Sequence, residues 1–98
     1  MTKRKYPTVP SRIRVAAKKT YEIVDIESFA DADILGECRY DLSQIVIKKG
    51  LSDKERFSTF IHEVIHMVSF ENDANLTENQ VLAMEHGLMK LLTLNKLI

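Results

Sequence analysis

The sequence predicts an α+β fold, in which a small antiparallel or mixed sheet with a hairpin packs on one helix and a second helix follows. Short stretches with alternating apolar positions occupy the first half of the chain, and two amphipathic helical patterns occupy the second half. A chain of 98 residues supports a single hydrophobic core. Because 45% of the residues are hydrophobic and 29% are charged, we expect a folded globular protein rather than a disordered or membrane-embedded one.

The expected strands are short and rich in β-branched and aromatic residues. Residues 12–16 and 19–26 each alternate such side chains with polar ones, which is typical of strands with one covered face. Residues 36–41 and 44–49 flank a turn-forming segment and end at Gly50. We therefore expect two strands followed by a β-hairpin.

Two helices are indicated by matching start sequences. Ser52 with Glu55, and later Thr77 with Gln80, have the spacing of a capping box, in which the two side chains bond the backbone at a helix start. Apolar residues then recur every three or four positions over residues 53–70 and again up to about residue 95. The second half is thus predicted to be a helical hairpin.

Charge is distributed unevenly along the chain. Residues 1–19 hold seven Lys and Arg and no acidic residue, although the whole chain has a formal net charge of zero. Pro7 and Pro10 disfavour a helix there, so we divide the chain into a basic extended lead-in (1–11) and one domain (12–98). No apolar stretch is long enough to span a membrane, and Cys38 is the only cysteine. A cytoplasmic protein without membrane contact is expected.

The segment HEVIH, from His62 to His66, has the sequence of a catalytic metal-binding motif on a helix. Two residues four apart on a helix differ by about 40° around its axis, so both imidazoles can bind one metal ion. Glu63 follows the first histidine, which places its carboxylate beside the metal rather than on it. There it can act as the general base that takes a proton from water. Two imidazoles and a carboxylate suit one Zn²⁺ ion best.

A catalytic zinc ion normally has three protein ligands, so a third one must come from outside the motif. Residues 67–80 lack both the glycine and the third histidine of the HExxHxxGxxH pattern, which favours a carboxylate from the second helix. Glu78 and Glu85 are the candidates, since they lie seven residues apart on nearly the same helix face. A simple hairpin geometry places Glu85 nearer the level of the histidines and Glu78 by the turn. Either side chain could point inward, and this geometry favours Glu85.

Three segments resemble the small phage and bacterial zinc metallopeptidases related to the ImmA/IrrE group. They are I-x-I before the helix (Ile45 to Ile47), HEVIH on it, and LTENQV at the start of the second helix. The resemblance implies a minimal, gluzincin-like zincin fold with Glu78 as the third ligand and Glu85 as the alternative. It also implies that a sheet edge beside the helix receives an extended substrate. We expect this edge to be Gln44, Ile45, Val46, Ile47 and Lys48.

The predicted function is hydrolysis of peptide bonds by a zinc-activated water, with Glu63 as base and a protein or peptide, for example a transcriptional regulator, as substrate. One alternative is a non-catalytic zinc-binding regulator, such as a phage anti-repressor. Another is a nucleic-acid-binding protein that uses the basic lead-in, which the lack of a recognised nucleic-acid motif disfavours. Cys38 and Tyr40 are interpreted as packing residues.

Overall fold

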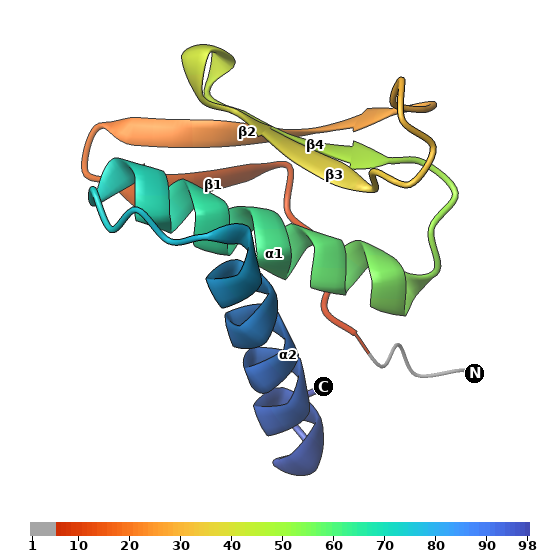
Figure 1. Ribbon diagram of the computed structural model, residues 1–98. Coiled ribbons are helices and arrows are strands. Elements are labelled where there is room, and N and C mark those ends of the chain that lie inside the picture. The colour runs from red at the N-terminus through yellow and green to blue at the C-terminus, as the bar shows by residue number, and fades with distance from the viewer. Residues whose placement is uncertain (1–5) are drawn as a thin grey trace.

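A four-stranded mixed sheet forms one layer of the fold, and the first helix lies along one of its faces (Figure 1). The computed structural model describes residues 6–98. The strands are β1 (Arg12–Ala16), β2 (Lys19–Ile26), β3 (Gly36–Arg39) and β4 (Gln44–Lys48). Their order in the sheet is β1-β2-β4-β3, in which only the β2–β4 pairing is parallel. The predicted α+β class, the two early strands and the hairpin are confirmed.

Strand β4 lies inside the sheet, which corrects one prediction. Ile45 pairs with Ile23 of β2 on one side and with Cys38 of β3 on the other. Gln44–Lys48 is therefore not a free edge, and the prediction that it offers one to a substrate is wrong. The cause is the parallel pairing of β2 with β4, which joins strands that are not consecutive in the sequence. Within the described residues, β3 is the outer strand on this side of the sheet.

Helix α1 (Asp53–Glu71) begins with the predicted capping box. The Ser52 hydroxyl accepts a hydrogen bond from the Glu55 amide, and the Glu55 carboxylate accepts one from the Ser52 amide. Phe60 and Met67 on this helix pack into the core with residues of β2 and β4. Glu63 lies between them at helical spacing, so it shares the face that is turned toward the sheet. Its burial follows from this position on the helix.

Helix α2 (Glu78–Leu94) also starts at its predicted capping box, in which Thr77 and Gln80 bond each other's backbone amides. Its path departs from a simple helical hairpin. Residues 72–77 turn back along α1, and α2 then runs away from the middle of α1 instead of lying alongside it (Figure 1). Only Val81 of α2 is buried. Several of its large apolar side chains are exposed: Leu82, Met84, Leu88, Leu91 and Leu94.

The segment before β1 has no helix or strand between residues 6 and 11, as predicted for the lead-in. Val9 nevertheless packs against the core, and the Tyr6 ring lies 6.2 Å from that of Phe57. Residues 1–5 of the predicted basic lead-in lie outside the described part of the chain. No helix within residues 6–98 is both long and apolar enough to cross a bilayer.

Candidate metal centre

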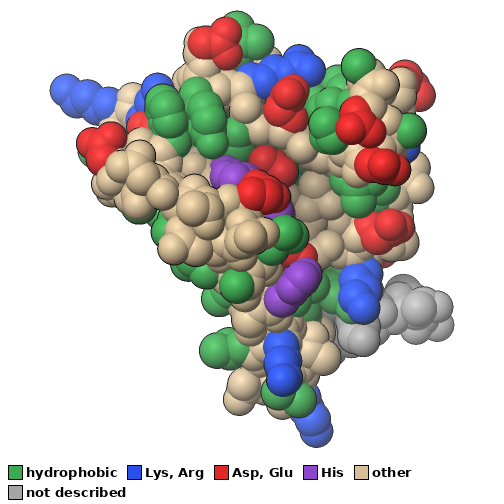
Figure 2. Space-filling model, viewed as in Figure 1, with side chains coloured by type: hydrophobic (Ala, Val, Ile, Leu, Met, Phe, Trp, Pro, Cys, Tyr) green, Lys and Arg blue, Asp and Glu red, His purple; other side chains and the backbone are tan. Residues whose placement is uncertain are grey.

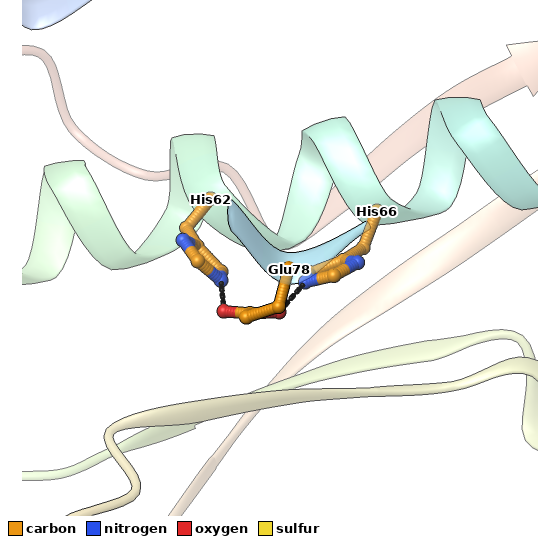
Figure 3. A group of neighbouring side chains, drawn as sticks. All are labelled: His62, His66 and Glu78. Atoms are coloured by element: carbon orange, nitrogen blue, oxygen red, sulfur yellow. Dashed lines mark hydrogen bonds and ion pairs between the residues drawn. The ribbon is translucent and has the colours of Figure 1, made fainter. Parts of the chain in front are cut away.

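His62 and His66 stand one turn apart on α1 and turn their rings toward the same point (Figure 3). Their ring centroids are 4.9 Å apart, with the planes inclined by 64°. The two side chains are 14% and 23% exposed, so both remain reachable from solvent while their rings are held by neighbours. This is the arrangement that four-residue spacing on a helix predicts for a pair of ligands.

Glu78 completes the group from the first residue of α2. One carboxylate oxygen lies 2.8 Å from Nε2 of His62, and the other lies 2.7 Å from Nε2 of His66 (Figure 3). A ligand atom from each of the three residues falls within 4.8 Å of the others, which is compact enough to hold one metal ion. Two imidazole nitrogens and a carboxylate oxygen form the donor set of many catalytic zinc sites. The chemistry of these donors is therefore compatible with a divalent metal ion such as zinc.

The loop between the helices explains why Glu78 reaches both histidines. Asp73 and Asn75 adopt positive φ angles of 53°, a left-handed conformation that Asp and Asn tolerate better than most residues. Ser69 ties the loop to the last turn of α1, because its hydroxyl accepts from the Leu76 amide and its carbonyl accepts from the Ala74 amide. The chain is thus brought back along α1 before α2 begins. The prediction that Glu78 stays by the turn, below the level of the histidines, is wrong for this reason.

Glu85, the alternative third ligand, approaches the opposite side of His62. Its carboxylate oxygen lies 2.9 Å from Nδ1 of His62, and its side chain is 15% exposed, whereas that of Glu78 is 59% exposed. Within the described residues, the group that could hold a metal ion consists of His62, His66 and Glu78. Both carboxylates that the sequence suggested therefore reach this centre, but they contact different nitrogens.

Glu63 is buried directly beside the histidines, with 6% of its surface exposed. Burial raises the pKa of its carboxyl group above the ordinary value, and the neighbouring His62 and His66 partly oppose that shift. The side chain also lines two cavities that contain His62 and Glu78. A carboxylate with a raised pKa at the side of a metal site is suited to accept and return a proton.

A cleft between β3 and the two helices gives access to the centre. One cavity of about 390 Å³ is lined by residues that include Gly36, Cys38 and Glu63, and a neighbouring one of about 380 Å³ includes Asp33 and Glu85. In the space-filling view, histidine and acidic side chains meet near the middle of this face (Figure 2). The site is therefore open along β3 rather than enclosed.

Cys38 and Tyr40, which the sequence led us to interpret as packing residues, line the same cavity as His62 and Glu63. The Cys38 thiol donates to the backbone carbonyl of Glu63 across 3.1 Å, and burial raises the pKa of this thiol. The Tyr40 hydroxyl lies 3.5 Å from the carbonyl of His66, its ring stacks on Phe70 with centroids 4.0 Å apart, and burial raises its pKa to about 12. Gly36 and Cys38 alternate on the helix-facing side of β3, and Tyr40 follows the strand as the first residue of a 3₁₀ turn (Tyr40–Leu42). The sequence shows the alternation, but it could not predict that these residues lie beside His62, because they are far from it along the chain.

Comparison of the chain with protein-family models, with curated proteins and with solved structures gave no match.

Proposed function

We propose that the protein is a zinc-dependent metallopeptidase that cleaves an extended peptide bound in the cleft beside β3. The observation that carries this proposal is the Glu78 carboxylate, which faces Nε2 of both His62 and His66 at 2.7–2.8 Å while Glu63 lies buried at their side. The local likeness of HEVIH and LTENQV to metallopeptidases of the ImmA/IrrE group supports the same proposal.

His62, His66 and Glu78 would hold the metal, and a zinc ion bound there would polarise a peptide carbonyl and lower the pKa of water toward about 7. Glu63 supplies the proton transfers. Its carboxylate takes a proton from the attacking water and later donates that proton to the leaving nitrogen of the peptide. Burial raises the pKa of the Glu63 carboxyl group in the metal-free protein, and a carboxylate with a raised pKa is a stronger proton acceptor.

Strand β3 is the edge along which we place the substrate. It lies at the end of the strand order, and its residues Gly36 and Cys38 line the same cavity as His62 and Glu63. An extended peptide can add to such an edge through backbone hydrogen bonds, which bind many sequences without deep side-chain pockets. This placement replaces Gln44–Lys48 as the proposed substrate edge.

Proteolysis of fluorescein-labelled casein by zinc-loaded protein tests the proposal. We expect Glu63→Gln to bind zinc like the wild type but to cleave about 10²–10⁴-fold more slowly, since only the general base is lost. Glu22→Gln is a matched control, because Glu22 is an exposed glutamate of β2 away from the cleft. Equal cleavage by the wild type and by Glu63→Gln would refute the mechanism.

The non-catalytic alternative keeps one observation in its favour. The exposed apolar side chains of α2, including Leu88, Leu91 and Leu94, form a surface of the kind that binds protein partners. A zinc-binding regulator would hold the metal as tightly as a peptidase, but no protein would be cleaved in the casein assay by any variant. The two functions are therefore separated by the same experiment.

A further inference from the structure

His62 is contacted at both of its ring nitrogens, in contrast to His66. Its Nε2 lies 2.8 Å from Glu78, and its Nδ1 lies 2.9 Å from Glu85. The Glu85 and His62 side chains are 15% and 14% exposed, so their contact is largely shielded from water. Within the described residues, the carboxylate that pairs with His66 meets its Nε2 and not its Nδ1.

A ring nitrogen that donates its proton to a carboxylate leaves the other nitrogen as a lone pair for a metal. We propose that Glu85 is a positioning residue, which accepts the Nδ1 proton of His62 and thereby fixes the ring with Nε2 toward the metal. This inference rests on the proposed zinc site and assigns a role to a carboxylate that is not one of its ligands. Glu85 also makes the His62 nitrogen a stronger donor to the metal.

The course of α2 separates the roles of the two glutamates. Glu78 and Glu85 are seven residues apart, so they lie on nearly the same helix face but about 10 Å apart along the axis. The start of α2 therefore places Glu78 between the two histidines, and the next turns carry Glu85 past the far side of the His62 ring. Glu85 contacts Nδ1 of His62, whereas the metal site lies on the Nε2 side of the ring. Glu85 could therefore bind the same metal ion as Nε2 of His62 only if the ring moved aside.

A purely structural role is the competing explanation, in which the contact between Glu85 and His62 only fastens α2 to α1. The two roles differ in what they do to the proton on Nδ1. A positioning residue keeps this proton in place when zinc is bound, and a glutamine can partly replace it because its side-chain oxygen still accepts a hydrogen bond. A structural fastening predicts a loss of folding stability without a change at the metal.

The experiment measures zinc affinity by competition with a chromophoric chelator, for the wild type, Glu85→Gln, Glu85→Leu and Glu78→Gln. We expect Glu85→Leu to lower zinc affinity about 10–100-fold and Glu85→Gln to lower it less. Glu22→Gln is the control for loss of a negative charge. Thermal unfolding of each zinc-free variant shows whether the fold is retained. If Glu85→Leu does not fold, the zinc affinity of Glu85→Gln, whose side chain has nearly the same shape as that of glutamate, is compared with that of Glu78→Gln instead.

Nitrogen-15 NMR of the histidine rings in the zinc-loaded protein gives the direct readout. We expect a slowly exchanging proton on Nδ1 of His62 in the wild type and in Glu85→Gln, and a rapidly exchanging one in Glu85→Leu, with His66 unchanged. If Glu85→Leu binds zinc with an affinity within about threefold of the wild type, this inference is overturned but the proposed function is not. Zinc bound through Nδ1 of His62, or an equal and severe loss in Glu85→Gln and Glu78→Gln, would also overturn it. A wild type that binds no zinc would overturn both this inference and the proposed function.

Discussion

A Cβ atom on Gly36 would lie 2.6 Å from Cγ2 of Thr59 on helix α1. It would also lie 3.2 Å from Cγ of Glu63. The absence of a side chain at Gly36 therefore lets β3 approach α1 at the level of the candidate centre. This close approach sets the width of the cleft beside Glu63.

Gly36→Ala is expected to lower the free energy of unfolding by about 1–3 kcal/mol, because the added methyl group must push β3 or Thr59 aside. Urea denaturation of the zinc-free protein measures this loss. Adding Thr59→Ser removes the clashing Cγ2 atom and should restore part of it. Gly87→Ala is the control: a methyl group there would meet nothing within 4 Å, and alanine favours the helix by up to about 1 kcal/mol. A neutral Gly36→Ala would contradict the close packing.

The buried carboxyl group of Glu63 predicts a pH dependence of stability in the zinc-free protein. Its pKa in the fold is raised above the ordinary value of 4.5, so the folded state holds a proton that the unfolded state releases. The protonated Glu63 carboxyl group therefore makes its full contribution to the free energy of unfolding below about pH 4.5. This contribution is lost as the pH rises through the raised pKa. Relative to the wild type, Glu63→Gln should become steadily more stable as the pH rises from about 4.5 through the raised pKa. A difference that is constant across this range, in paired urea titrations, would show that the carboxyl group is not shifted.

The caps of the two helices should have different consequences. Ser52→Ala and Thr77→Ala each remove a side-chain acceptor at a helix start, and each should cost about 0.5–2 kcal/mol of stability. Only Thr77 precedes Glu78, so Thr77→Ala should also weaken zinc binding, whereas Ser52→Ala should leave it unchanged. Calorimetric zinc titrations of the two variants compare them directly. Equal zinc affinities would mean that the cap does not position Glu78.

The Cys38 thiol should react slowly with iodoacetamide. Burial raises its pKa, and the negative charge of Glu63 raises it further, so little reactive thiolate is present at about pH 8.5. We expect alkylation at least about tenfold slower than in urea-unfolded protein, with a rate that still increases above about pH 9.5. Glu63→Gln should accelerate it, since one cause of the shift is removed. Mass spectrometry at timed intervals follows the reaction, and a rate that levels off near about pH 9 would argue against the shift.

Much of the fold could be predicted because its determinants are local. Alternation marked the strands, and the capping boxes at Ser52 and Thr77 marked the starts of both helices. The four-residue spacing of His62 and His66 also predicted that their rings share one side of α1. Each of these features depends on residues within one or two turns of each other.

The remaining features depend on contacts between distant segments. The parallel pairing of β2 with β4 made β3, rather than Gln44–Lys48, the outer strand. The backward turn of the loop through Asp73 and Asn75 brought Glu78 to the histidines and left Glu85 on the far side of His62. The residues that form the strand order and the loop can be read in the sequence. The direction in which the chain turns back depends on packing between distant segments, which a single sequence does not reveal.

Zinc titration of the purified protein, followed by competition with a chromophoric chelator, tests the central claim most directly. We predict one zinc ion per chain in the wild type and in Glu63→Gln, and loss of tight binding in His66→Ala and Glu78→Gln, because only the last two remove a ligand. Absence of stoichiometric zinc in the wild type, or wild-type affinity in both ligand variants, would contradict the claim that His62, His66 and Glu78 form a zinc centre.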